Sequence, residues 1–358
     1  MPIDLRTRKL AKLVIDYSLF VKPGENVMIS GGEEAIPFMV ELYKAVILKG
    51  AHPVVKFNLP NVSDFFYKYA NKEQLEKFPE ITMDNVKKCQ KYVGIITESN
   101  TRELTNVNPK KIAERSKITY PVTEYVCNSK PLIYRCSVAF PCPALAQEAG
   151  MSLTEYENFV YGACLLDWKK LGKRMNKIAD KFRKGKKVHL IGENVDLKFE
   201  IHGKKAVASI ATENMPDGEI FMAPVRESLN GWIKFEYSSI KYGKEVSDIY
   251  LKFENGKVIE SKASKNEDFM KSLLSTDENS SYVGEFGIGC NPKVNSYTNE
   301  LIFDEKIGGT IHLALGSAYV ENGGGNDSAL HWDIVKDMKK AKIVLDGKVV
   351  QQNGKWVI

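Results

Sequence analysis

The sequence predicts an α/β protein with a mostly parallel sheet flanked by helices in its amino-terminal part and a β-rich α+β domain in its carboxy-terminal part. Helical segments alternate with short apolar, strand-like runs as far as about residue 183, and such alternation favours parallel strands joined by helices. After Gly185, short β-like runs separated by turn signals take over, which is typical of hairpins. The change places a boundary near residue 185 and predicts domains 1–185 and 186–358.

The first domain begins with a segment in which charges recur among apolar residues, as in an amphipathic helix. The apolar runs NVMIS and PVVKF follow, separated by one helical segment, which is the pattern of a strand–helix–strand unit. The predicted elements of this domain are helices near 5–21, 34–49, 62–90, 109–116 and 141–183, and strands at 26–30, 53–57, 92–97 and 132–138.

The second domain contains two strong signals for tight hairpins. Asn255-Gly256 and Asp346-Gly347 each lie between β-like runs, and these residue pairs tolerate the positive φ angles that two-residue turns require. The β-like runs are KVHLIG, DLKFEIHGK, AVASI, GEIFMAP, GWIKFEY, DIYLKFENGKVIESKA, YVGEFGIG, GTIHLALG and IVLDGKVVQQNGKWVI.

The composition is that of an ordinary globular protein. The 358 residues include 43% hydrophobic and 10% aromatic side chains, enough for two buried cores. The first segment lacks the apolar centre of a signal peptide, and no run approaches the roughly 18 apolar residues of a membrane span. The six cysteines form no C-x-x-C pair, which favours reduced thiols. We therefore expect a cytoplasmic protein with no membrane partner.

The net charge of +6 includes one concentrated basic stretch, from Lys169 to Lys187, with ten Lys or Arg against the single acid Asp180. Such a run invites a nucleic-acid interpretation. The favoured alternative is an amphipathic helix with lysines in water, whose inward residues are Leu171, Met175, Ile178 and Phe182. No nucleic-acid partner is therefore expected.

The stretch from Asp304 to Asp333 holds two of the five histidines of the chain beside carboxylates and a tyrosine. His312 lies in the apolar run TIHLAL, where a strand would hold it rigidly on one face. His331 and Asp333 are two residues apart, and a strand would direct both side chains to the same side, whereas a helix would splay them. The pattern indicates a metal site.

Two glutamates in the same half of the chain are candidates to join it. Glu219 follows a Pro-Asp-Gly turn at the start of a predicted strand, and Glu285 is flanked by glycines that let backbone or ligand approach closely. An acid beside a turn is usually a solvated surface group, and a lone strand histidine is usually a structural one. The hypothesis therefore depends on the whole set.

Four blocks of the second half, NMPDGEIFMAP, GEFGIGCNP, DEKIGGTIHLALGSAY and GGGNDSALHWD, resemble the thermophilic aminopeptidase (aminopeptidase T-like) family of metallopeptidases. The resemblance implies peptide substrates, a homodimer, two divalent metal ions and catalytic roles for Glu285 and Tyr319. The metal ligands that it implies are Glu219, Glu285, His312, His331 and Asp333.

The charge count agrees with that ligand set. Three carboxylates against two divalent ions leave a net charge of +1, which one bound hydroxide neutralises. Five ligands exceed the three of a typical catalytic zinc site and suit two ions joined by a bridging carboxylate. Oxygen and nitrogen ligands without thiolate suit zinc, cobalt or manganese and do not choose among them.

The expected mechanism is hydrolysis of the first peptide bond by water that two ions activate. Glu285 is the first choice for accepting and passing on the proton, and the neutral phenol of Tyr319 would donate a hydrogen bond to the developing oxyanion. Two other functions stay open. One is a two-metal phosphoesterase, for which Lys306 or Arg226 would be the nearby cation; the other is a peptide- or nucleotide-binding protein with a structural metal.

Several neighbouring residues are open to two interpretations. Glu305 is either an outer-shell residue that orients His312 or, as favoured, part of a charged surface turn. Arg226 and Trp232 follow the Glu219 strand and are weak candidates for lining a substrate pocket. His189 and His202 lie outside the matching blocks and are expected to be structural.

Overall fold

The computed structural model describes residues 4–319 and 322–357. The chain forms two compact units, the first made of Met1–Leu166 with Ala211–Pro216 and the second of Asp167–Ile210 with Asp217–Ile358. Two domains divided near residue 185 remain a prediction; in the structure the helix before that point packs within the second unit, and residues 211–216 belong to the first.

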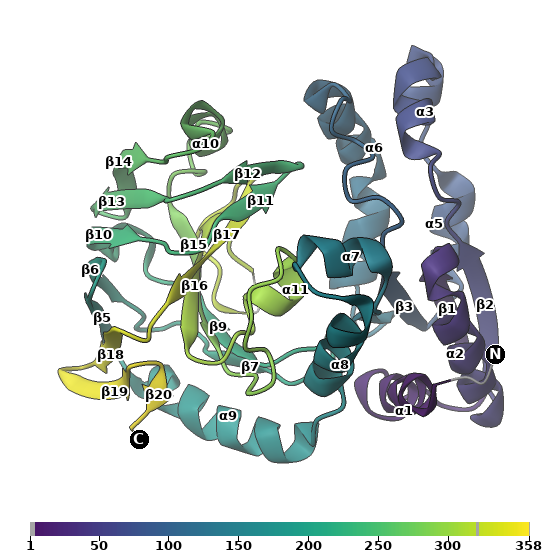
Figure 1. Ribbon diagram of the computed structural model, residues 1–358, viewed down its shortest axis with the longest axis horizontal. Coiled ribbons are helices and arrows are strands. Elements are labelled where there is room, and N and C mark those ends of the chain that lie inside the picture. Colours follow the sequence, from purple (N-terminus) through teal and green to yellow (C-terminus); the bar gives the residue numbers. More distant parts are fainter. Residues whose placement is uncertain (1–3, 320–321, 358) are drawn as a thin grey trace. The chain divides into compact units, whose positions relative to one another are not determined.

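The first unit is built on a parallel five-stranded sheet in the order β2-β1-β3-β4-β8, as the alternating pattern predicts (Figure 1). Its strands are β1 (Asn26–Gly31), β2 (His52–Phe57), β3 (Lys91–Ile96), β4 (Tyr134–Ala139) and β8 (Asn214–Met215). The short strand β8 has no predicted counterpart, because two residues are too few to show a period.

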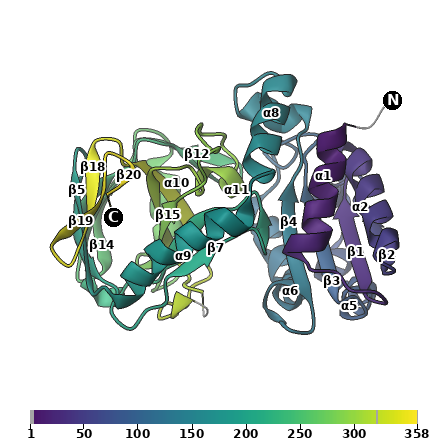
Figure 2. The same ribbon diagram turned by 90° about the horizontal axis from the view of Figure 1, so that it is seen from below.

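Helices flank this sheet, with α1 and α2 on one side and α5 and α6 on the other (Figure 2). The helices of the unit are α1 (Leu5–Leu13), η1 (Val14–Ser18), η2 (Glu33–Ala35), α2 (Ile36–Leu48), α3 (Ser63–Tyr69), α4 (Lys72–Glu76), α5 (Glu80–Lys87), α6 (Pro109–Asn128), α7 (Pro143–Glu148) and α8 (Leu153–Cys164). Helix α6 continues past its predicted end at residue 116, because Val122, Tyr125 and Val126 pack with Met28 of β1 and so outweigh the internal Pro121.

The second unit contains an antiparallel eight-stranded sheet in the order β14-β13-β10-β6-β5-β18-β19-β20. Its strands are β5 (Lys187–Gly192), β6 (Val195–Glu200), β10 (Asn230–Lys234), β13 (Tyr250–Glu254), β14 (Lys257–Lys262), β18 (Ala341–Leu345), β19 (Lys348–Gln352) and β20 (Lys355–Trp356). Both predicted tight turns are confirmed: Asn255-Gly256 joins β13 to β14 and Asp346-Gly347 joins β18 to β19, all four residues with positive φ.

A second antiparallel sheet in this unit, of five strands, has the order β17-β16-β15-β9-β7 (Figure 1). Its strands are β7 (Val207–Ser209), β9 (Glu219–Met222), β15 (Val283–Gly289), β16 (Thr310–Gly316) and β17 (His331–Asp337). The unit also contains β11 (Ser239–Lys241), β12 (Lys244–Val246), η3 (Arg226–Ser228), α10 (Glu267–Leu274) and α11 (Leu301–Asp304).

One face of the five-stranded sheet, here called the apolar face, packs into a core shared with the eight-stranded sheet. The rings of Phe286 on β15 and Phe199 on β6 meet edge to face, with centroids 5.0 Å apart. The side chains of this face that lie in the core include Ile220, Phe286, Ile288, Ile311, Leu313, Leu315, Trp332 and Ile334. Because strand side chains alternate, their neighbours in sequence point to the opposite face.

The basic stretch forms helix α9 (Trp168–Lys184), which packs an apolar stripe into the same core. Met175, Ile178 and Phe182 are buried and Leu171 is partly buried, as the amphipathic interpretation predicts. Asp167 caps the helix by accepting a hydrogen bond from the backbone of Lys170.

All six cysteines are free thiols. Over residues 4–319 and 322–357, none of the helices is both long and apolar enough to span a bilayer.

Candidate metal centre

The five predicted metal ligands lie on four adjacent strands of the five-stranded sheet. Glu219 is on β9, Glu285 on β15, His312 on β16, and His331 and Asp333 on β17. The register pairs Ala314 with both Glu285 and Asp333, so these two carboxylates flank one position of β16. All five belong to the face opposite the core, here called the polar face.

Gly287 makes room for His312 on this face. The two residues are partners across β15 and β16, and the imidazole of His312 lies over the glycine. A Cβ added to Gly287 would lie 2.0 Å from Nε2 and 2.1 Å from Cε1 of that ring. Gly287, one of the glycines that flank Glu285, therefore allows the side chain of His312 to approach the backbone closely.

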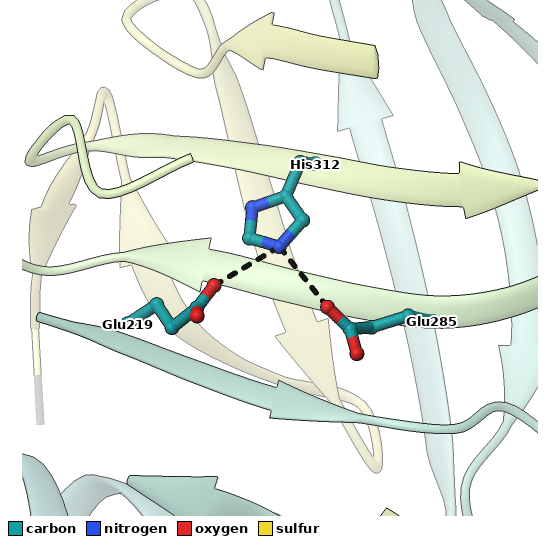
Figure 3. A group of neighbouring side chains, drawn as sticks. All are labelled: Glu219, Glu285 and His312. Carbon is teal, nitrogen blue, oxygen red and sulfur yellow. Dashed lines mark ion pairs between the residues drawn. The ribbon is translucent and has the colours of Figure 1, made fainter. Parts of the chain in front are cut away.

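The imidazole of His312 points between the carboxylates of Glu219 and Glu285 (Figure 3). Its Nε2 lies 3.1 Å from Oε2 of Glu219 and 3.4 Å from Oε1 of Glu285. The buried amide of Asn322 donates to the other oxygen of Glu285, at 3.3 Å. One side of the centre is thus a buried imidazole between two carboxylates that come from neighbouring strands.

The other side of the centre is formed by His331 and Asp333, which the extended strand β17 directs to the same face, as predicted. Nε2 of His331 lies 3.3 Å from Oδ2 of Asp333. Nδ1 of His331 is 2.9 Å from the carbonyl oxygen of Ser317 and must donate to it, which leaves Nε2 as the ring nitrogen that can bind a cation.

The ligand atoms fall into overlapping groups whose members lie within 4.8 Å of one another. One group is Glu219, Glu285 and His312, and a second is Glu285, His331 and Asp333. Glu285 belongs to both. A third group adds Glu305 to His312 and Asp333.

Glu305 is part of the centre, and the favoured interpretation as a surface turn is wrong. Its side chain is only 16% exposed, and it accepts a hydrogen bond from the buried ammonium of Lys306, which also donates to Glu219 at 2.7 Å. The sequence favours the surface turn over a position beside His312, because a charged tripeptide is normally solvated, and only the tertiary fold buries Glu305.

The residues present fit divalent cations. Among the residues that the structure describes, Oε2 of Glu219, both ring nitrogens of His312 and Oδ1 of Asp333 are buried without a hydrogen-bond partner. Buried polar atoms normally have partners, and leaving one without costs free energy. Carboxylate oxygens and imidazole nitrogens that converge in this way are ligands of zinc, cobalt or manganese.

The carboxylates and imidazoles perturb one another. Burial raises the pKa of Glu285, and the charges of Glu219 and Asp333 raise it further. Burial opposes the charged form of His331, but Asp333 outweighs it and raises the pKa of that imidazole to about 9. The pKa of His312 is also raised, because its carboxylate neighbours outweigh its burial. Both rings must lose a proton before they bind a cation, so cation binding here is coupled to proton release.

Tyr319 lies beside this centre, in the segment that follows β16. Its ring centroid is 5.0 Å from that of His331 and 6.4 Å from that of Phe221, a neighbour of Glu219 on the polar face. The residue is 49% exposed, yet loss of hydration around the phenol and the charges of Glu285 and Asp333 raise its pKa above the ordinary value. The hydroxyl therefore stays a proton donor at neutral pH.

Arg226 and Trp232, the weak candidates for a substrate pocket, have partners other than the ligand groups. Arg226 stacks on Tyr282, with 4.1 Å from the guanidinium carbon to the ring centroid, and donates to Asn279. Trp232 stacks on Tyr250 in the eight-stranded sheet. A cavity of about 80 Å³ opens beside Asp333, and neither residue belongs to its lining, which is Ser238, Ser239, Ile240, Lys241, Tyr297, Asn299, Leu301, Asp304, Trp332, Asp333 and Val335.

His189 and His202, which are expected to be structural, each pair with a carboxylate. Nε2 of His189 lies 2.7 Å from Asp196, and Nδ1 of His202 lies 3.0 Å from Glu200. Neither histidine is in a group that could hold an ion among the described residues.

Comparison with known proteins identifies the class to which this fold and site belong. The profile of the thermophilic metalloprotease family (M29) matches residues 4–356. The chain therefore belongs to that family and is a metallopeptidase, a hydrolase of peptide bonds.

Particular relatives agree with this assignment over nearly their whole length. Aminopeptidase AmpS of Bacillus subtilis is 26% identical, with 97% of each chain covered, and aminopeptidase T of Thermus thermophilus is 25% identical, with 98% of each covered. The solved structure of wild-type AmpT from Thermus thermophilus superposes with a TM-score of 0.86 at 23% identity, covering 99% of each chain, and so has the same fold.

Proposed function

We propose that this protein is an aminopeptidase that releases N-terminal residues from peptides with two divalent ions bound on the polar face. The observation that carries the proposal is the double membership of Glu285. One carboxylate completes both ligand groups, Glu219 with His312 and His331 with Asp333, as expected of a bridging ligand between two ions. The names of the curated relatives support the choice of aminopeptidase.

In this proposal each ligand has a distinct part. Glu219 and His312 would hold one ion, His331 and Asp333 would hold the other, and Glu285 would contribute to both groups. When bound, divalent ions would supply Lewis acidity, which makes a nearby water more acidic and polarises a peptide carbonyl. Their identity stays among zinc, cobalt and manganese, since the ligand types suit all three.

Glu285 and Tyr319 are the proposed catalytic residues. Glu285 would accept the proton of the attacking water and deliver it to the leaving amine, because it is the carboxylate common to both ligand groups and so lies beside the water. Tyr319 would donate a hydrogen bond from its hydroxyl to the oxyanion. The position of its ring next to His331 suits this role. Selection for N-terminal residues follows if the free amine of the substrate binds at the same centre.

The test is a substrate panel with purified protein reconstituted in turn with zinc, cobalt and manganese. Amino-acyl chromogenic amides, their N-acetylated counterparts and a phenyl phosphate are assayed with and without chelator. We expect cleavage of the free-amine amides alone, abolished by chelator and restored by metal. Cleavage of blocked amides would make the protein an endopeptidase, and activity that survives full metal removal would exclude the proposal.

The alternative functions find less support. A phosphoesterase needs a free cation near the ions, but Lys306 is held by two carboxylates and Arg226 by Tyr282 and Asn279. A closed structural site is usually rich in cysteine, whereas the groups here contain only carboxylates and imidazoles.

We also propose a homodimer in the cytoplasm. The free thiols are compatible with a reducing compartment. Sedimentation equilibrium over a range of concentrations tests the dimer, and a mass of 40.3 kDa at all of them would refute it.

A further inference from the structure

The centre contains a cation of its own, the ammonium of Lys306. This lysine is 0% exposed and lies in the turn between α11 and β16. Its backbone is fixed at both ends, since its N–H donates to Phe303 and its carbonyl oxygen accepts from Asn291 at 3.0 Å. Buried lysines are rare and need partners that offset the loss of hydration.

The partners of Lys306 are two carboxylates of the centre. The ammonium donates to Oε1 of Glu219 at 2.7 Å and to Oε1 of Glu305. The other oxygen of Glu219, Oε2, lies 3.1 Å from Nε2 of His312 and is buried without a hydrogen-bond partner among the described residues. The two oxygens of Glu219 are therefore different: the lysine holds one, and the other faces the ligand group.

We propose that Lys306 is a positioning residue that restricts Glu219 to one-oxygen coordination. A free carboxylate can bind a cation through one oxygen or both. With Oε1 held by Lys306, only Oε2 remains for an ion, and the same holds for Glu305, whose Oε1 is also occupied. The inference rests on the proposed role of Glu219 as a metal ligand.

The lysine also sets the charge of the centre. When ions are bound, their carboxylate ligands are ionised, so Glu219, Glu285, Glu305 and Asp333 carry −4 together, and Lys306 reduces this to −3. Two divalent ions then leave +1, the charge that one hydroxide cancels. Without Lys306 the ions would meet one more unit of negative charge and a free oxygen on Glu219, so they should bind more tightly.

Substitution of Lys306 by methionine tests this role, because methionine keeps the length of the side chain but neither its charge nor its donors. Co²⁺ is the probe. It is titrated into metal-free protein, and the affinity, the stoichiometry and the visible absorption are recorded. Co²⁺ absorbs less strongly as its coordination number rises, so the spectrum reports whether Glu219 has gained a second contact.

We expect K306M to bind Co²⁺ at least tenfold more tightly than the unaltered protein and with weaker visible absorption. Lys336 supplies the control, because it is equally buried, pairs with Glu236 at 2.7 Å and extends from the opposite face of β17. K336M should lose stability and keep the affinity and spectrum. The inference is overturned if K306M behaves like K336M, or if it binds Co²⁺ no more tightly than before.

A second variant guards against misfolding, since K306M leaves Glu219 and Glu305 buried without their cation. K306M/E305Q removes one charge of each sign and still frees Oε1 of Glu219, so the weakened Co²⁺ absorption should remain. An unchanged spectrum in the double variant overturns the inference. If the unaltered protein binds no Co²⁺ at all, the proposed function fails as well, which separates the two conclusions.

Discussion

The two faces of the five-stranded sheet are buried to a similar degree and yet differ in every other respect. Ile311 and Leu313 on the apolar face are 0% exposed, and so is His312 between them on the polar face. The apolar side chains fill a core shared with a second sheet. The polar ones leave oxygen and nitrogen atoms without partners among the described residues. Burial alone therefore does not identify a core. The two faces are told apart by whether they bury polar atoms that lack hydrogen-bond partners.

The difference has an energetic consequence. Burial of the apolar face stabilises the fold through the hydrophobic effect. Burial of unpartnered carboxylate and imidazole atoms costs free energy, and ligands that bind only the folded state restore it in proportion to their concentration. We infer that the polar face gains its stability from bound ions, whereas the apolar face is stable without them. The predictions below act on one face at a time.

The largest effect on activity is expected at Tyr319, whose ring lies beside His331 on the polar side. Tyr319→Phe removes one oxyanion donor, which typically lowers turnover by about 10²–10³-fold. Metal content should not change, because Tyr319 is not one of the five proposed ligands. Steady-state kinetics on an amino-acyl amide, with metal analysis of the same sample, measures both.

Tyr250→Phe is the matched control for that variant. It makes the same chemical change on a ring that stacks on Trp232 in the eight-stranded sheet, and turnover should stay near the unaltered value. Full turnover in metal-loaded Tyr319→Phe would remove this residue from the mechanism.

Gly287 is a position on the polar face that has no side chain and lies opposite His312. Gly287→Ala would place a methyl group 2.0 Å from Nε2 of His312 and so displace the imidazole from Glu219 and Glu285. Disturbing a ligand's orientation typically costs about 10–100-fold in metal affinity or activity. Competition with a chelator of known affinity measures the loss.

Gly162→Ala serves as the control for this substitution. An added Cβ on Gly162, in helix α8, has no heavy atom within 4 Å, so the protein should keep its metal affinity. If Gly287→Ala binds metal as tightly as Gly162→Ala, then metal binding does not depend on the position of the His312 imidazole over Gly287.

Much of this comparison could be predicted from the sequence, because strand side chains have a period of two. The alternation in TIHLAL separates His312 from Ile311 and Leu313, and the two-residue spacing of His331 and Asp333 directs both to one face. The parallel sheet and both tight turns follow from equally local signals, namely alternating segments and the pairs Asn255-Gly256 and Asp346-Gly347.

What could not be predicted depends on contacts between distant segments. The local sequence around Glu305 and Lys306 predicts a solvated turn. Only the approach of Glu219, 87 positions earlier, makes them part of the centre. The sequence does not distinguish Gly287 from the other glycines near Glu285, because its role depends on its partner across the sheet, His312. The position of helix α9 in the chain predicts that it belongs to the first half, whereas its apolar stripe packs in the second unit.

The smallest effect on activity is expected from the apolar face, at Leu313, the direct neighbour of His312. Leu313→Ala removes a side chain that is 0% exposed in the shared core, and such truncations cost about 2–5 kcal/mol of stability. Denaturant unfolding of metal-free and metal-loaded protein should show the same loss in both, because the cavity lies on the side of the sheet away from the ligands. Turnover per folded molecule and Co²⁺ affinity should stay within about twofold. A large drop in Co²⁺ affinity would mean that the two faces are energetically coupled through β16, and the contrast between them would then describe their chemistry but not their stability.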